Sequence, residues 1–226
     1  MNNHKLSNEP IINELNPPRF IAVEGPIGVG KSTLVRRLAD SLGYQSVLEK
    51  PEENPFLERF YANQRHAALS AQLFFLFQRA QQLSDLRQSD LFEQSHIADF
   101  VFQKDPLFAQ ITLDANELEL YNKVYQQVEV DIPTPDLVIY LQAPVKVLKE
   151  RIQHRGVRFE RSIDNDYLER VNEAYSQFFL SYNDSPLLII NAAEIDFANN
   201  DSQYQQLLQY LLEIRSGRHY FNPTFF

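Results

Sequence analysis

Residues 25–32 read Gly-Pro-Ile-Gly-Val-Gly-Lys-Ser and match the pattern G-x-x-x-x-G-K-[ST]. An apolar run with the character of a strand, residues 19–24, comes directly before the match, and an amphipathic stretch with the character of a helix, residues 32–42, overlaps its last residue. Glycines in such a loop let backbone N–H groups turn toward phosphate oxygens, and the positive end of the following helix adds to the attraction. The stretch therefore predicts a strand, a phosphate-binding loop and a helix in succession.

The loop also predicts how a nucleotide is held. Lys31 is expected to reach the β and γ phosphates, and the Ser32 hydroxyl is expected to bind Mg²⁺. A purine nucleoside triphosphate with Mg²⁺ is the ligand that this pattern indicates. A tight glycine turn that binds nothing is the alternative, and the strand and helix on either side argue against it. The residues expected to contact the nucleotide are Gly25, Gly28, Gly30, Lys31, Ser32 and Thr33.

Outward from the loop, short apolar runs alternate with longer helical segments, which is typical of an α/β fold with a parallel sheet flanked by helices. Strands are expected at 19–24, 45–49, 95–99, 136–142 and 187–191. Helices are expected at about 31–42, 55–62, 65–88, 101–110, 114–129, 144–154, 165–182 and 201–214. The last ten residues, GRHYFNPTFF, are rich in aromatic side chains, and we expect them to dock against the body of the protein or against a partner chain.

Length and composition favour one globular domain. The chain has 226 residues, of which 44% are hydrophobic and 23% are charged. Residues 1–18 are polar and predict a flexible leader, so the single domain is expected to span residues 19–226.

Charge and cysteine content narrow the class of function. A net charge of -9 disfavours binding to polymeric nucleic acid, because an acidic surface repels the phosphate backbone. The chain has no cysteine, which excludes a disulfide framework, a thiolate zinc site and a cysteine nucleophile. The amino-terminal residues lack the features of a secretory signal, and every apolar run is far shorter than the roughly 20 residues of a membrane span. We therefore expect a cytoplasmic protein with no membrane segment.

Acidic residues at the ends of the expected strands are candidates for the chemistry. Ligands of open parallel sheets bind beyond the carboxyl ends of the strands, which selects Glu24, Glu49 and Asp99 and discounts Asp136 at the start of a strand. Phosphoryl transfer needs one carboxylate to orient or deprotonate the acceptor and another to support the metal. Glu49 and Asp99 are our candidates for these two roles. The alternative for each is a carboxylate that only begins a turn or caps a helix.

Two further segments carry candidate residues. Arg151 and Arg155 lie four residues apart on one helical face, and their planar guanidinium groups suit a transferring phosphoryl group. A solvated helix face paired with Glu150 is the alternative, and the phosphate loop upstream favours the first interpretation.

The segment 70–79 combines aromatic rings, which are more often core, with amides such as that of Gln72, which can hydrogen-bond a nucleobase. The five histidines are scattered without a helical i, i+4 pair, so a histidine metal site is not indicated.

Together these motifs resemble the deoxynucleoside kinases, most closely the bacterial branch that acts on purine deoxynucleosides. The resemblance covers residues 19–190 and rests on VEGPIGVGKST, EKPEENPFLERFY, QLFFLFQR, ADF, PDLVIYL and RIQHRGVRFE. It implies a P-loop NTPase fold with three α/β/α layers, a five-stranded parallel sheet and a helical lid. It further implies a homodimer that transfers the γ-phosphoryl group of ATP to the 5'-hydroxyl of a deoxynucleoside.

The resemblance also implies roles for single residues. Glu49 would be the general base, and Tyr61 and Glu160 would bind the sugar 3'-hydroxyl. Arg151 and Arg155 would be the lid arginines. Asp99 would be the acid of an acid-Arg-Ser type motif. From the residues themselves we add Asp99 beside Ser32 as a metal-binding residue, and Gln72 and Arg79 as substrate-binding residues.

At two positions the sequence departs from the family pattern. Phe100 stands where many members have an arginine directly after the motif's acid, and Arg79 is a candidate substitute for that charge. Ser70 stands where relatives often place a base-reading glutamine, and Gln72 is turned by about 200° from it around the helix. The base preference and the choice of ATP or GTP as donor therefore stay open. A thymidylate-type nucleoside monophosphate kinase and a nucleotide-binding subunit without catalysis are the alternative functions.

Overall fold

A computed structural model describes residues 17–62, 64–88, 94–128 and 132–222 of the chain. Six parallel strands form one sheet in the order β2-β3-β1-β4-β5-β6. The strands are β1 (Phe20–Glu24), β2 (Gln45–Val47), β3 (His96–Ala98), β4 (Leu137–Gln142), β5 (Leu187–Asn191) and β6 (Arg218–Phe221). The α/β class with a parallel sheet is thereby confirmed.

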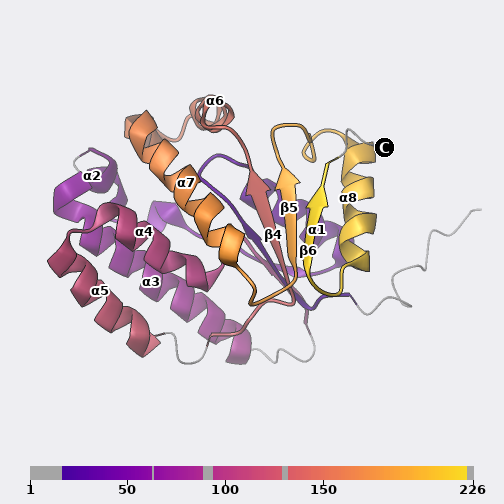
Figure 1. Ribbon diagram of the computed structural model, residues 1–226, viewed down its shortest axis with the longest axis horizontal. Coiled ribbons are helices and arrows are strands. Elements are labelled where there is room, and N and C mark those ends of the chain that lie inside the picture. Colours follow the sequence, from indigo (N-terminus) through magenta and orange to yellow (C-terminus); the bar gives the residue numbers. More distant parts are fainter. Residues whose placement is uncertain (1–16, 63, 89–93, 129–131, 223–226) are drawn as a thin grey trace, which may run out of the picture.

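Helices cover both faces of this sheet, which gives three layers (Figure 1). The helices are α1 (Lys31–Leu42), α2 (Leu57–Ala62), α3 (Gln64–Gln88), α4 (Asp105–Thr112), α5 (Ala115–Val128), α6 (Val145–Arg155), α7 (Asn165–Ser181) and α8 (Asp201–Glu213). Short 3-10 turns are η1 (Pro51–Glu53), η2 (Phe102–Lys104) and η4 (Arg158–Ser162). Among the described residues, no helix has both the length and the apolar character that crossing a membrane requires.

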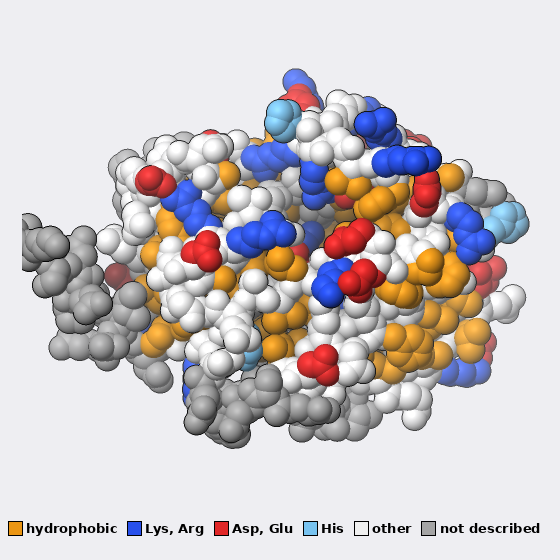
Figure 2. All heavy atoms as spheres, turned by 180° about the vertical axis from the view of Figure 1, so that it is seen from behind, with side chains coloured by type: hydrophobic (Ala, Val, Ile, Leu, Met, Phe, Trp, Pro, Cys, Tyr) orange, Lys and Arg blue, Asp and Glu red, His pale blue; other side chains and the backbone are white. Residues whose placement is uncertain are grey.

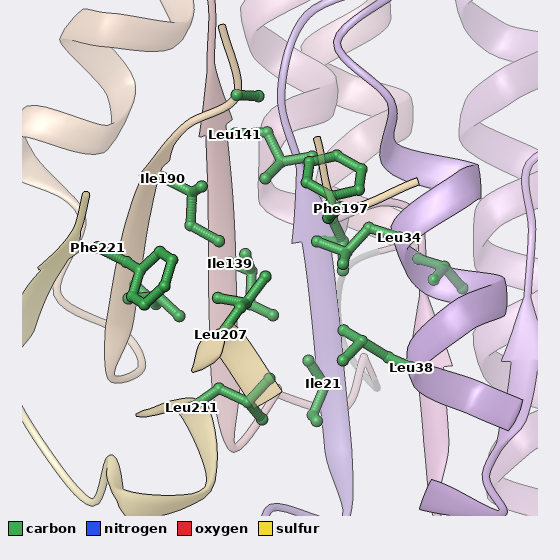
Figure 3. Close-up of a cluster of buried hydrophobic side chains, with 14 of the residues drawn as sticks. Ile21, Leu34, Leu38, Ile139, Leu141, Ile190, Phe197, Leu207, Leu211 and Phe221 are labelled. Atoms are coloured by element: carbon green, nitrogen blue, oxygen red, sulfur yellow. The ribbon is translucent and has the colours of Figure 1, made fainter. Parts of the chain in front are cut away.

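Successive side chains of β1 point to opposite faces of the sheet, and each face is covered by a cluster of buried apolar side chains. Ile21 and Val23 point to the face covered by α1 and α8, where Leu34 and Leu207 complete a buried cluster (Figure 3). Ala22 points to the opposite face, which α7 covers. A strand buried on both faces reads as a continuous apolar run, which is why the run FIAV could be recognised in the sequence.

The expectation of five strands was wrong, because residues 218–221 form a sixth strand. β6 pairs with β5 in register, Leu187 opposite Arg218, and Phe221 enters the core. This tetrapeptide lacks the continuous apolar run by which a strand can be recognised. Its first residue, Arg218, does not enter the core and donates hydrogen bonds to the Phe179 and Tyr182 carbonyl groups. The carboxyl-terminal segment therefore docks on the body of the protein through residues 218–221. Residues 1–16 of the expected leader and residues 223–226 lie outside the described residues.

Candidate active site

The phosphate loop connects β1 to α1 in the way its glycines require. Gly28 has φ 83°, and a Cβ atom there would lie 2.9 Å from the Leu148 carbonyl oxygen. Gly30, with φ 109°, precedes α1 without a side-chain cap. No side chain caps the first N–H groups of α1, which are therefore available to bind a phosphate group. Lys31 Nζ donates to the Gly25 carbonyl oxygen at 2.7 Å, and burial lowers the pKa of this lysine.

Ser32 and Asp99 meet at the end of the loop. Ser32 Oγ donates to Asp99 Oδ2 at 2.6 Å, while the Glu49 backbone N–H donates to Asp99 Oδ1 at 2.7 Å. Burial, together with the charge of Glu49, raises the pKa of Asp99. The described residues contain no cluster of three or more His, Asp or Glu side chains that could hold a metal ion by itself. Mg²⁺ fits this pair of oxygen groups, because it is commonly bound by one or two protein oxygens together with substrate phosphates and water.

Glu49 lies between two cations. β2 ends at Val47, and Glu49 follows two residues later, so its carboxylate projects beyond the edge of the sheet. Arg79 Nε donates to Glu49 Oε1 at 2.5 Å, and Lys104 Nζ lies 3.2 Å from the same oxygen. Burial acts to raise the pKa of Glu49, but Arg79, Lys104 and Lys31 outweigh it and lower this pKa to about 2. The carboxylate is therefore ionised at neutral pH and can accept a hydrogen bond from an acceptor hydroxyl.

The ion pairs that hold this carboxylate in place were not predicted from the sequence. Lys104 Nζ forms an ion pair with Glu24 Oε1 at 2.8 Å, and Arg79 Nη1 forms one with Asp105 Oδ1 at 2.6 Å. Both pairs are almost completely buried. A signal for them exists in the sequence, because Arg79 interrupts the apolar run LFFLF-Q-R-A and Lys104-Asp105 stands between FVFQ and PLFA. Charges inside apolar segments are rarely buried unless they are paired.

A cavity of about 860 Å³, part of it open to solvent, extends from the phosphate loop to the helices α2 and α3. Gln72 is buried and lines it, whereas Ser70 on the same helix is exposed and does not. Gln72 Nε2 donates to Thr112 Oγ1 at 3.4 Å. The Tyr61 and Phe159 rings lie parallel within 5°, with their centroids 6.4 Å apart. The wall thus offers an amide and flat rings, groups that can bind a nucleobase by hydrogen bonds and stacking.

The two candidate arginines of α6 have different surroundings. Arg155 donates to both carboxylate oxygens of Glu160, each at 2.6 Å, and both residues line the same cavity as Glu49. Arg151 instead donates to the Val29 carbonyl oxygen at 2.9 Å, beside the phosphate loop. In the described part of the chain Arg151 makes no ion pair with Glu150, so the alternative of a surface pair at this position is not supported. Figure 2 shows Lys and Arg side chains gathered at the top of the molecule, where Figure 1 places α6.

All predicted site residues except Gly25 line this cavity or a second hollow that shares the phosphate loop with it. The second hollow is bounded by Arg151 and by the segment 193–200 that follows β5, and Thr33 lines it. Gly25 lies inside the loop, where a Cβ atom would come 2.5 Å from the Leu141 carbonyl oxygen. Phe100 is buried and packs with Leu76, away from the cavity, so no charge from this position reaches the site.

The chain is similar to known proteins in both sequence and structure. The family model described as deoxynucleoside kinase matches residues 21–214. The chain is 34% identical over 205 residues to a deoxyguanosine kinase of Bacillus subtilis (strain 168), covering 88% of this chain and 99% of that protein. It is 30% identical over 205 residues to a deoxyadenosine kinase of Lactobacillus acidophilus, covering 84% of this chain and 94% of that protein. The structure of deoxyadenosine kinase from M. mycoides with bound dATP is similar with a TM-score of 0.75 and 28% identity, over 85% of this chain and 98% of that chain.

Proposed function

The chain belongs to the deoxynucleoside kinase family, and from this membership we propose that it transfers the γ-phosphoryl group of ATP to the 5'-hydroxyl of a purine deoxynucleoside. The observation that carries the proposal is one cavity lined by the phosphate loop, by the ionised Glu49 and by Gln72 with Tyr61. The family match does not favour a monophosphate kinase or a subunit without catalysis. Two relatives are named deoxyguanosine and deoxyadenosine kinases, which supports a purine acceptor.

In the proposed mechanism the protein mainly positions groups and stabilises charge. The phosphate loop and Lys31 hold the β and γ phosphates, and Glu49 accepts the proton of the 5'-hydroxyl as its oxygen attacks the γ-phosphorus. The bond from phosphorus to the bridging oxygen breaks, and ADP leaves. Arg151 and Arg155 neutralise the charge that develops on the transferred group. Ser32 and Asp99 would hold Mg²⁺ together with the phosphates, and the ion would supply neutralisation of phosphate charge there.

The acceptor is bound at the other end of the same cavity. We propose that Tyr61 and Glu160 bind the sugar 3'-hydroxyl, because both line the cavity and Arg155 holds the Glu160 carboxylate in place. Gln72 is proposed to hydrogen-bond the base, and Arg79 to act beside it through its contact with Glu49. Structures of deoxyadenosine kinase from M. mycoides with dATP and with dCTP show that this similar protein binds deoxynucleoside triphosphates.

A homodimer and a cytoplasmic location are also proposed. Phe77 on α3 and Leu120 on α5 are large apolar side chains with 52% and 50% of their surface exposed. Exposed apolar side chains on neighbouring helices are suited to an interface with a second copy of the chain. Sedimentation of the full chain would test this, and a monomer at micromolar concentration would contradict it.

An acceptor panel tests the activity. The protein is incubated with ATP, Mg²⁺ and one deoxynucleoside or deoxynucleoside monophosphate at a time, and the products are identified by mass. We expect monophosphates of deoxyguanosine and deoxyadenosine, and no product from a Lys31→Met control. Consumption of monophosphates alone would overturn the proposal, and a pyrimidine deoxynucleoside as the best acceptor would overturn its purine part.

A further inference from the structure

Lys104 is a buried cation that lines the cavity. Its side chain is 2% exposed and lies at the end of η2, directly before α4. Its Nζ atom contacts Glu24 Oε1 at 2.8 Å and Glu49 Oε1 at 3.2 Å, and it lies 5.9 Å from the centre of the Phe108 ring. An isolated ammonium group is costly to bury, so its position is determined by these two carboxylates.

Glu24 gives Lys104 a fixed anchor. Glu24 is the last residue of β1, is completely buried and directly precedes the first glycine of the phosphate loop. The Tyr175 hydroxyl from α7 donates to the same oxygen, Glu24 Oε1, at 3.0 Å. A strand in the middle of the sheet and a packed helix thus hold the Glu24 carboxylate. Lys104 extends this rigid support to Glu49, which lies on the irregular segment after β2.

Lys104 also supplies a positive charge to the site, which Phe100 at the position after Asp99 does not. Asp99 faces Ser32 of the phosphate loop, and Phe100, the next residue, packs into the core with Leu76. A charge carried directly after Asp99 would therefore have to leave the core to reach the site. The turn η2 brings Lys104, five residues after Asp99, back to the cavity. Arg79 also contacts Glu49, but it comes from α3 and not from the segment that follows Asp99.

The Glu49 carboxylate is held on one side only. In the described part of the chain, the hydrogen bond and the ion pairs to Glu49 all end on Oε1. The two cations fix this oxygen from α3 and from η2, so that rotation of the carboxylate is restrained and Oε2 is left for the acceptor hydroxyl. A misplacement of about 1 Å at such a group can cost about 100-fold in rate.

We propose that Lys104 is a positioning residue for the general base Glu49. Glu24, next to the phosphate loop, anchors Lys104, and Lys104 in turn holds the Glu49 carboxylate in place relative to the transferred phosphoryl group. Lys104 thereby takes the place of the arginine that many family members have directly after the acid at position 99. The proposal rests on the base role proposed for Glu49. Lys104 acts through Glu49, and so its loss should slow the chemical step while ATP binding, which depends on Lys31 and the phosphate loop, is retained.

The test uses four variants of the full chain and one control variant. Lys104→Met keeps the length of the side chain and removes the charge, but it leaves Glu24 buried and unpaired, which can unfold the protein. The double variant Glu24→Gln/Lys104→Met removes both charges of the buried pair, so that stability is regained. Glu49→Gln and the triple variant Glu24→Gln/Glu49→Gln/Lys104→Met complete a cycle in which Glu24 and Lys104 are replaced together. Lys123→Met serves as the matched control, because Lys123 on α5 forms only an exposed pair with Glu119.

Steady-state kinetics and thermal melts separate the outcomes. We expect Glu24→Gln/Lys104→Met to melt near the wild type and to have kcat reduced by about 100-fold with the KM for ATP unchanged. In the Glu49→Gln background, Glu24→Gln/Lys104→Met should cause little further loss of kcat, because the group that Lys104 positions is gone. Wild-type kcat in a folded Glu24→Gln/Lys104→Met variant would overturn the positioning role. So would a decrease in kcat of the combined variant that equals the product of the two separate decreases. Full turnover by Glu49→Gln would instead overturn the base role itself, so the two failures are distinguishable.

Discussion

Replacing Asp105 by asparagine tests whether the buried charges of the site depend on one another. Asp105 is the first residue of α4, and its side chain is completely buried against Arg79, whose own side chain is 5% exposed. Asparagine has nearly the same shape, so the change removes a charge without leaving a hole. Arg79 would then keep only one of its two carboxylate partners, Glu49.

The size of the effect follows from the burial of the pair. Breaking a buried ion pair by removing one partner costs about 3–5 kcal/mol, because the other charge is left buried. Arg79 retains Glu49, which places the expected loss near the lower end, about 3 kcal/mol. For a chain of this length each kcal/mol lowers the melting temperature by about 2–4 °C, so we expect a decrease of roughly 6–12 °C.

A matched change on the surface provides the reference. Glu119→Gln breaks the pair with Lys123, in which the two side chains are 69% and 68% exposed, and such pairs contribute about 0–1 kcal/mol. Urea unfolding followed by circular dichroism gives the free energy of unfolding for both variants. If Asp105→Asn costs no more than Glu119→Gln, Arg79 does not depend on Asp105 and the idea of a coupled buried network is refuted.

Three further changes test other parts of the site and fold. Glu49→Gln should lower kcat by about 100-fold to 10,000-fold in steady-state assays while ATP affinity by calorimetry is retained, and an equal loss in both would contradict the base role. Gly28→Ala should weaken ATP binding in the same titration, because its Cβ atom would meet the Leu148 carbonyl oxygen at 2.9 Å; Gly43→Ala, with φ 69° but open space around it, is the control for backbone strain alone. His96 is buried, and burial lowers its pKa. As the pH falls below about 6.5, this histidine therefore takes up a proton in the unfolded chain before it does so in the folded chain. The free energy of unfolding should then fall by at most about 1.4 kcal/mol per pH unit as the pH decreases. His96→Leu should remove that slope, and an unchanged slope in urea unfolding would contradict the assignment.

The parts of the site that could be predicted are those fixed by local pattern or by strand order. The phosphate loop has a continuous motif, and a parallel sheet brings the carboxyl ends of its strands to one edge, which is why Glu49 and Asp99 could be placed together from the sequence alone. The Glu49 backbone and the Asp99 side chain are indeed in hydrogen-bond contact. The sixth strand could not be found in this way, because RHYF begins with Arg218 and His219 and lacks the apolar run that marks β1, β4 and β5.

The buried cations could not be predicted for a different reason. Arg79 lies in the middle of α3, and Lys104 ends a 3-10 turn, so neither is placed by the strand-end argument. Their contacts depend on how α3 and η2 pack against the sheet edge, which a helical period does not specify. Ser70 and Gln72 do point in different directions, as expected, and the packing of α3 decides that Gln72 is the one in the cavity.

The alternating row of Glu24, Lys104, Glu49, Arg79 and Asp105 is not explained by stability alone. Burying a pair of charges often gains nothing over apolar side chains of the same volume, whereas losing one member of the pair is costly. Such a row therefore makes single substitutions destabilising without making the fold more stable than an apolar core would. What it does provide is a carboxylate, Glu49, that is desolvated, ionised and unable to rotate freely at the edge of the phosphate loop. If this is why the charges are buried, removing Glu24 and Lys104 together should leave the protein folded and slow, whereas removing either one alone should destabilise it.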